Sequence, residues 1–247
     1  MLSVNGVVKS YRTGGVFSRE RHTVLHSISF EWKPGERLGI IGESGSGKST
    51  LGRLLIGIEK PDRGSVLFHG QNIGDPQVRR GRISAVFQDY TSSINPFYTV
   101  EQALLEPLKQ QNTGRRESLE KIDLLLQQVG LEPSYRSKYP HELSGGQAQR
   151  VCIARAVVTE PECIVLDEAV SSLDGSVQFQ VLELLQKIGD LYGVGYIFIT
   201  HDIQAAAYVC DRVMFIRNGH IVETAETDQL KNVQSPYARA LLQAVTP

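Results

Sequence analysis

The sequence predicts an α/β fold built around a parallel sheet. Three short apolar runs, at 37–41, 163–167 and 196–200, have the length and composition of buried strands. The first two are followed by segments with apolar residues at helical spacing, and strands that alternate with helices favour a parallel sheet. A glycine-rich stretch at 42–50 joins the first run to its helix, and the rest of the chain is organised around it.

The composition is that of an ordinary globular protein, and it limits the partners. The chain has 247 residues, of which 41% are apolar and 21% charged, so one large domain or two small ones are possible. A formal net charge of −1 gives no electrostatic reason to expect a nucleic acid or an anionic membrane as a partner. No apolar run approaches the roughly 20 residues that span a bilayer, and the first residues do not form a leader, so we expect the chain to stay in the cytosol.

The three cysteines predict neither a disulfide framework nor a zinc site. Cys152, Cys163 and Cys210 are an odd number, and they lack the paired spacing of metal ligands. We therefore expect buried free thiols.

The stretch 42–50 has the G-x-x-x-x-G-K-[ST] spacing of a phosphate-binding loop. It lies between the predicted strand 37–41 and a helix with apolar positions at Leu51, Leu54 and Leu55. Backbone N–H groups of the loop and of the helix start would form one anion-binding concavity, whereas a chance glycine-rich turn is the alternative. The loop comprises Gly42, Glu43, Ser44, Gly45, Ser46, Gly47, Lys48, Ser49 and Thr50.

Two side chains of this loop supply nucleotide chemistry. Lys48 would bring a positive charge to the outer phosphates, and the Ser49 hydroxyl is placed to coordinate a magnesium ion that bridges two of them. The sequence therefore predicts a nucleotide site with Mg²⁺.

Residues 2–34 are strand-rich and contain a polar loop, at 12–23, that is too long for a tight hairpin. Tyr11 lies just before this loop and is a candidate to stack on a purine, because a flat ring offers contact area at little entropic cost. A half-buried strand tyrosine is the alternative, and the spacing does not decide between the two.

A third candidate, Gln88, ends the predicted strand 83–87. Ligands of parallel sheets gather beyond the carboxyl ends of the strands, so Gln88 can reach toward a metal or a water there. Most glutamines at strand ends are simply solvated.

From about residue 92 to 159 the pattern changes to helices and indicates a helical subdomain. Pro107 is expected to end or kink one helix, and Gly130 to end the next. Ser144 can cap the helix 148–158, whose uncluttered start also suits an anion, although a plain N-cap is the simpler reading. The segment before this helix is Leu143, Ser144, Gly145, Gly146 and Gln147.

Two carboxylates follow the buried run at 163–166. Asp167 and Glu168 would leave such a strand on opposite sides, which gives them separate tasks. Asp167 can hold the magnesium from its second shell, and Glu168 can orient or deprotonate the water that attacks the terminal phosphate. Two solvated turn acids are the alternative.

His201 follows the buried run 196–200. In a parallel sheet it would emerge at the same edge as Glu168 and the phosphate loop, where it could donate to the terminal phosphate or hold the attacking water. A histidine at the start of a helix is the alternative. After it, Asn218-Gly219 predicts a hairpin at the sheet edge, and Ser235-Pro236 begins a short final helix.

Taken together, these motifs resemble the ATP-binding-cassette ATPases over essentially the whole chain. The segment 143–147 looks like the LSGGQ signature, and Asp167-Glu168 ends a strand similar to Walker B. By the same resemblance Gln88 is the Q-loop glutamine, His201 the switch histidine and Tyr11 the aromatic residue that stacks on adenine. The D-loop corresponds to Ser172, Leu173 and Asp174.

The resemblance implies one ABC ATPase domain, 1–247, with a RecA-like parallel-sheet core and an N-terminal antiparallel β-subdomain. The core would comprise 1–91 and 160–247, and the inserted α-helical subdomain 92–159.

It also implies a mechanism. Two subunits pack head to tail, with ATP between the phosphate loop of one and the signature of the other. Glu168 is then the general base, Lys48 and Mg²⁺ act on the phosphates, and His201 acts on the terminal phosphate. Mg²⁺ is held by Ser49, Gln88 and Asp167, and hydrolysis reopens the dimer. Gln88 and the helical subdomain pass the motion to membrane permease subunits.

Three further segments look like the ATPases of peptide and nickel importers. They are 92–96 after Gln88-Asp89, the loop inserted before Thr23, and 235–242. Ala169-Val170 replaces the usual proline and threonine after the Walker B acids, as in the second ATPase of nickel or metal-chelate importers. We therefore expect import of nickel, cobalt, zinc or a metal–metallophore complex, with oligopeptide or dipeptide import as the alternative.

The expected partners are a second ABC ATPase subunit, related or identical, two membrane permease subunits and an extracytoplasmic solute-binding protein, with no nucleic acid. The expected location is the cytoplasmic face of the plasma membrane, as a peripheral protein. A soluble cassette ATPase of translation or DNA repair would have a second cassette, a coiled-coil insertion or basic surfaces, which the sequence does not show. Intact Lys48, Asp167, Glu168 and His201 argue against a regulatory protein with a dead site.

Overall fold

The computed structural model describes residues 1–13, 20–89, 93–109, 111, 114–171 and 173–244. Residues 14–19 of the loop before Thr23, the first residue of the segment 92–96, and Ser172 lie outside these ranges. The chain divides into two compact units, one of Met1–Arg80 with Gly195–Pro247 and one of Gly81–Val194. The predicted boundaries at 92 and 159 stay a prediction.

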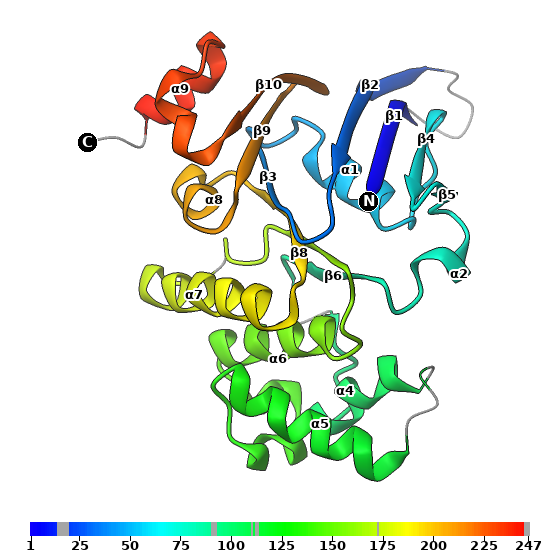
Figure 1. Ribbon diagram of the computed structural model, residues 1–247, viewed down its shortest axis with the longest axis vertical. Coiled ribbons are helices and arrows are strands. Elements are labelled where there is room, and N and C mark those ends of the chain that lie inside the picture. Colours follow the sequence, from blue (N-terminus) through cyan, green and yellow to red (C-terminus); the bar gives the residue numbers. More distant parts are fainter. Residues whose placement is uncertain (14–19, 90–92, 110, 112–113, 172, 245–247) are drawn as a thin grey trace. The chain divides into compact units, whose positions relative to one another are not determined.

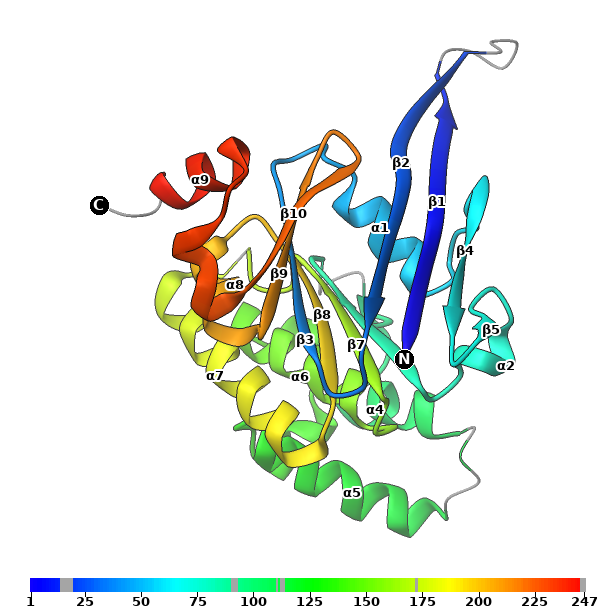
Figure 2. The same ribbon diagram turned by 45° about the horizontal axis from the view of Figure 1, so that its top comes forward.

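The first unit contains the predicted antiparallel N-terminal sheet, in the order β2-β1-β4-β5. β1 and β2 form a long ribbon, with β4 beside β1 (Figure 2). Alternate residues of β1 such as Leu2 and Val4 are buried, which is the pattern of a sheet with one covered face. The strands are β1 (Leu2–Arg12), β2 (Arg21–Trp32), β4 (Arg63–Phe68) and β5 (Gln71–Asn72).

The same unit holds parallel strands that carry the phosphate loop. β3 (Arg37–Ile41) pairs in parallel with β8 (Gly195–Thr200) on one side and with β9 (Arg212–Arg217) on the other. Every residue of β8 is buried, as expected for a strand covered on both faces. The predicted hairpin is confirmed, because β9 pairs antiparallel with β10 (His220–Glu226) around Asn218 and Gly219, both with positive φ.

Short helices complete the first unit. The loop after β3 leads into α1 and that after β8 into α8, while α9 follows β10 (Figure 2). They are α1 (Lys48–Leu55), α2 (Pro76–Arg79), α8 (Ile203–Val209), the 3₁₀ turn η3 (Thr227–Asn232) and α9 (Pro236–Gln243).

The second unit combines a parallel strand pair with the predicted helices. β6 (Ile83–Phe87) pairs in parallel with β7 (Cys163–Asp167). In Figure 1, α4, α5 and α6 pack together in the green part of the chain. The helical elements are α4 (Val100–Leu108), α5 (Arg115–Gln128), η1 (Pro133–Ser137), η2 (Pro140–Glu142), α6 (Gly145–Val157) and α7 (Gly175–Tyr192).

The predicted helix stops have clear physical causes. Gly130 has φ 75°, and its N–H bonds the carbonyl of Gln127 while that of Leu131 bonds the carbonyl of Leu126, which is a Schellman ending for α5. Pro107 lies inside α4, and that helix ends one residue later at Leu108.

The parallel strands are packed tightly against the N-terminal sheet in the first unit. A Cβ at Gly195, the first residue of β8, would lie 2.4 Å from Trp32 Cζ2 and 2.7 Å from the Glu36 carbonyl oxygen. Trp32 is fully buried, and its Nε1 donates to that same carbonyl at 2.9 Å. Neither neighbour is free to give way.

We therefore expect Gly195→Ala to lower the free energy of unfolding by about 1–3 kcal/mol, the usual cost of overpacking. Gly175→Ala is the matched control, because no described atom lies within 4 Å of its added Cβ. The control should be neutral or stabilising by up to about 1 kcal/mol, since alanine favours a helix more than glycine does. Urea unfolding measures both, and equal stabilities would contradict the packing argument.

Candidate functional site

The phosphate loop joins β3 to α1. Packing requires a glycine at both positions where the motif specifies one, Gly42 and Gly47. A Cβ at Gly42 would lie 2.2 Å from the carbonyl oxygen of Ile216 in β9. A Cβ at Gly47 would lie 2.7 Å from Leu25 Cδ2, and Gly47 has φ 102°, which only glycine adopts without strain. The spacing seen in the sequence therefore corresponds to two places where a side chain has no room.

Lys48 lies inside the loop rather than in solvent. Its side chain is buried, and Nζ donates to the carbonyl of Gly42 at 2.7 Å and to that of Glu43 at 3.0 Å. Ser46 is buried as well, and its Oγ has no hydrogen-bond partner among the described residues. A buried ammonium beside an unpaired hydroxyl at a helix start fits a phosphate group, which accepts hydrogen bonds from both.

Tyr11 is half-buried near the end of β1, as the alternative of a half-buried strand tyrosine predicted. Its hydroxyl donates to Glu59 Oε2 at 2.7 Å and lies 3.5 Å from Oγ1 of Thr50, the last residue of the phosphate loop. The structure thus brings Tyr11 next to the loop, while its stacking on adenine stays a prediction.

Glu59, which accepts the hydrogen bond from Tyr11, is the centre of an ionic cluster. The sequence analysis did not predict this cluster. Arg53 Nε lies 2.6 Å from its Oε1, and Lys9 Nζ lies 3.1 Å from its Oε2. Burial alone would raise the pKa of Glu59, but the hydrogen bonds from Tyr11, Arg53 and Lys9 outweigh it and lower the pKa. No local pattern marks these residues, because they come from β1, from α1 and from the segment after α1.

Register places His201 and the phosphate loop at one edge. Ile41 of β3 is paired with Thr200 of β8, so Gly42 and His201 are the residues that directly follow a matched pair. This confirms the expectation that His201 emerges at the same edge as the loop. His201 is exposed, and Asp202 after it caps α8.

The same arrangement recurs in the second unit. Phe87 of β6 is paired with Asp167 of β7, so Gln88 and Glu168 directly follow a matched pair. Gln88 is exposed, and Asp167 and Glu168 are half-buried. The structure brings these residues to the carboxyl edge of one strand pair.

Glu168 has an unusual backbone conformation. Its φ is 51°, in the left-handed region, which few residues other than glycine, asparagine and aspartate adopt. Its carbonyl accepts hydrogen bonds from the N–H and the Oγ of Ser171, which stabilise the turn. The extended alternation of β7 therefore ends at Asp167, and a locally strained residue stands where the sequence predicts a catalytic one.

The signature segment contains the predicted cap of α6, but the helix begins at Gly145 and not at the predicted residue 148, because the capping box lets Gly145–Gln147 form its first turn. Ser144 is the N-cap, and its side chain and that of Gln147 satisfy each other's backbone N–H groups in a capping box. A Cβ at Gly146 would lie 2.7 Å from Val177 Cγ1 of α7, so this glycine permits close helix packing. A hollow of about 410 Å³ beside the cap is lined by Ser144, Gly145, Gly146, Gln147, Leu173 and Asp174 among others.

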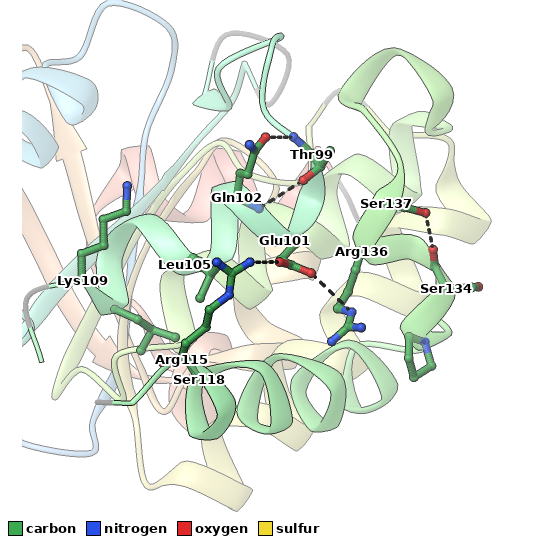
Figure 3. Close-up of a pocket in the computed structure, with 12 residues that line it drawn as sticks. Thr99, Glu101, Gln102, Leu105, Lys109, Arg115, Ser118, Ser134, Arg136 and Ser137 are labelled. Carbon is green, nitrogen blue, oxygen red and sulfur yellow. Dashed lines mark hydrogen bonds and ion pairs between the residues drawn. The ribbon is translucent and has the colours of Figure 1, made fainter. Parts of the chain in front are cut away.

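Another hollow, of about 660 Å³, lies among α4, α5 and η1 (Figure 3). In it Glu101 lies between two arginines, with Oε1 3.7 Å from Arg115 Nη2 and Oε2 3.7 Å from Arg136 Nε. Thr99 caps α4 through a capping box with Gln102. This hollow contains none of the predicted site residues.

Further predictions concern metals, thiols and membranes. Cys152, Cys163 and Cys210 are buried and free, as expected, and burial raises the pKa of Cys152 to about 12. Across the described ranges, no group of three or more histidine, cysteine or acidic side chains could hold a metal ion. No helix in the described part of the chain is both long enough and apolar enough to cross a membrane.

Comparison with known proteins identifies the family. The sequence matches the model of the ABC transporter family over residues 25–171. The chain belongs to this family.

The cassette fold is confirmed by a solved ABC structure. The dimeric post-hydrolysis state of the ATP-binding cassette MJ0796, bound to ADP and Pi, superposes with a TM-score of 0.82. It is 28% identical and covers 92% of this chain and 99% of its own.

Curated ABC relatives extend over the full chain. The metal-staphylopine import system ATP-binding protein CntF of Staphylococcus aureus (strain NCTC 8325 / PS 47) is 48% identical over 98% of both chains. The nickel import ATP-binding protein NikE of Rhodospirillum rubrum is 40% identical and covers 100% of this chain and 92% of its own. A putative peptide import ATP-binding protein of Brucella ovis is 40% identical and covers 99% and 78%.

The ionic cluster at Glu59 predicts a pH-dependent stability. Because the pKa of Glu59 in the folded chain lies below the ordinary 4.5, its carboxylate stabilises the fold fully above that value. The contribution is lost as the pH falls through the lowered pKa. At pH 7, Glu59→Gln should lower the free energy of unfolding by about 1 kcal/mol.

Urea unfolding at a series of pH values tests this. The difference between the wild type and Glu59→Gln should shrink as the pH is lowered below 4.5. Glu31→Gln, a change at an exposed position of β2, is the control and should show little difference at any pH. A gap that widens in acid would contradict the assignment.

Proposed function

We propose that this chain is the ATP-hydrolysing subunit of an ABC importer, and that the importer brings in nickel, cobalt, zinc or a metal–metallophore complex. The observation that carries the proposal is the relative named for metal-staphylopine import, which is 48% identical over 98% of both chains. The nickel-import relative supports the same class of solute at 40% identity.

ATP binds, on this proposal, at the loop 42–50. The Lys48 ammonium moves from the loop carbonyls, which now hold it at 2.7 and 3.0 Å, to the phosphates. N–H groups of the loop and of the α1 start cradle the same phosphates, and Tyr11 stacks on the adenine. The Ser46 hydroxyl, buried and without a described partner, supports an anionic guest.

Hydrolysis needs a base and a group that binds the terminal phosphate. Glu168 takes the base role, because its carboxylate directly follows the end of β7 and can accept a proton from the attacking water. His201 takes the phosphate role at the edge that it shares with the loop.

Mg²⁺ fits the donor set of oxygen ligands. Suitable oxygen donors stand in each unit, namely the Ser49 hydroxyl in α1, and the Gln88 amide oxygen and the Asp167 carboxylate at the carboxyl edge of the β6–β7 pair. When bound, it neutralises charge on the phosphates.

The signature 143–147 acts on a second ATPase subunit. Its capped helix start presents N–H groups and the Ser144 hydroxyl to an anion. The D-loop residues Leu173 and Asp174 line the same hollow, which supports a joint role at the subunit interface. The remaining partners are two permease subunits and an extracytoplasmic solute-binding protein, with the chain peripheral on the cytoplasmic face of the plasma membrane.

Peptide import is the second candidate. A relative named for putative peptide import has the same 40% identity as the nickel-import relative, although it is longer and this chain covers 78% of it. These two identities are equal, so a transport experiment has to distinguish metal import from peptide import.

Glu168→Gln separates binding from hydrolysis. The amide keeps the shape of the side chain but cannot accept a proton, so ATP binding should persist, turnover should fall by about 100-fold or more, and ATP should hold a closed dimer. Nucleotide titration, phosphate release and size-exclusion chromatography measure these three properties. Glu160→Gln is the matched control, because Glu160 also has φ 51° but belongs to no motif. Unimpaired turnover in Glu168→Gln would remove the assignment.

The solute is tested in source cells that carry Glu168→Gln, with Glu160→Gln cells as the control. Cellular nickel, cobalt and zinc should fall while uptake of labelled peptides stays normal. Loss of peptide uptake with normal metal content would instead establish the peptide importer.

A further inference from the structure

We propose that Tyr237 is a positioning residue for the phosphate loop, so that the C-terminal helix α9 controls nucleotide affinity. The inference rests on the proposed ATP site. The backbone N–H of Glu43, the second residue of the loop, donates to Tyr237 Oη at 3.0 Å. The two residues are 194 positions apart, and the structure brings them together within one compact unit.

Tyr237 is well fixed. The residue is only 7% exposed, and the Arg217 guanidinium carbon lies over its ring, 5.0 Å from the ring centroid. Burial raises the pKa of its hydroxyl, so the group stays neutral at physiological pH and offers both a proton and lone pairs. A rigid aromatic side chain with one polar tip is suited to hold a backbone group in place.

The helix that carries Tyr237 is itself anchored to β10. The carboxylate of Glu223 accepts from the N–H groups of Gln234 and Ser235, both at 2.7 Å. Ser235 caps the helix, and Arg239 Nε donates to the Val233 carbonyl at 2.9 Å. Hydrogen bonds thus tie the edge strand β10 to the start of α9, and Tyr237 of α9 to the loop.

A second contact supports the loop near its middle, at Ser46. The N–H of Gly219, in the turn between β9 and β10, donates to the Ser46 carbonyl at 3.0 Å. The C-terminal part of the chain therefore contacts the loop at Glu43 and at Ser46, on either side of Ser44 and Gly45. These external bonds reduce the number of conformations open to the loop before nucleotide binds.

Such preorganisation has a measurable consequence. If the hydroxyl is removed, the loop samples conformations that do not bind phosphate, and the apparent affinity falls in proportion to the competent fraction. One hydrogen bond of ordinary strength corresponds to a dissociation constant about threefold to tenfold higher. The turnover number at saturating ATP should change little, because Tyr237 bonds the loop and not the reacting atoms.

The experiment compares Tyr237→Phe with Tyr192→Phe, which removes a tyrosine hydroxyl bonded to Gln128 in the other unit. Calorimetric titration with MgADP should give the predicted rise for Tyr237→Phe and no change beyond twofold for the control. Hydrogen exchange at the peptide that contains Glu43 should become faster only in Tyr237→Phe. Wild-type affinity together with wild-type exchange in Tyr237→Phe would overturn the inference.

Glu223→Gln tests the anchoring step. One carboxylate oxygen becomes an NH₂ group facing a backbone N–H, so the variant should raise the MgADP dissociation constant in the same direction. The double variant Glu223→Gln/Tyr237→Phe should bind MgADP with the same dissociation constant as Tyr237→Phe alone, because both substitutions act through the one bond from Glu43 to Tyr237. Additive effects would show that Glu223 acts by another route and would overturn this step.

The two proposals fail in different ways. A wild-type chain that binds neither MgADP nor MgATP would refute the proposed function, whereas the exchange at Glu43 would still report whether Tyr237 holds the loop.

Discussion

The conformation of the phosphate loop at 42–50 depends on one close approach of two backbones. Ile216, at the end of β9, places its carbonyl oxygen where a Cβ at Gly42 would be 2.2 Å away. Gly47, later in the loop, is confined by the buried side chain of Leu25 in β2, whose Cδ2 would lie 2.7 Å from an added Cβ. The glycines of the motif are thus fixed by the neighbouring strands as well as by the curvature of the loop, and the loop conformation is a property of the whole sheet.

Strand register then decides which side chains lie near one another within each unit. The pairs Ile41–Thr200 and Phe87–Asp167 end their strands together, so the residue after each is delivered to the same edge. A register shift of one residue would turn every side chain of the shifted strand to the opposite face. Both strand pairs are parallel, and β3, β7 and β8 are mostly buried, which makes such a shift costly and keeps the edge residues in place.

The contacts around the loop come from distant parts of the chain. Tyr11, near the N-terminus, meets Thr50 and Glu59, and Tyr237, near the C-terminus, meets Glu43. The segment 235–242 resembles one found in peptide and nickel importers. On our proposal it holds the phosphate loop in place, because it contains Tyr237. ATP affinity in such a chain would respond to substitutions far from the nucleotide.

The sequence by itself determined the features that depend on neighbouring residues. The phosphate loop, the Ser144 cap, the stop at Gly130 and the Asn218-Gly219 hairpin follow from spacing and from conformational preference. Only the tertiary structure decided the left-handed turn at Glu168, the ionic cluster at Glu59 and the bond from Glu43 to Tyr237. The last two join residues far apart in the chain, and the turn at Glu168 lies at the end of a buried strand, so all three depend on how the strands and helices pack.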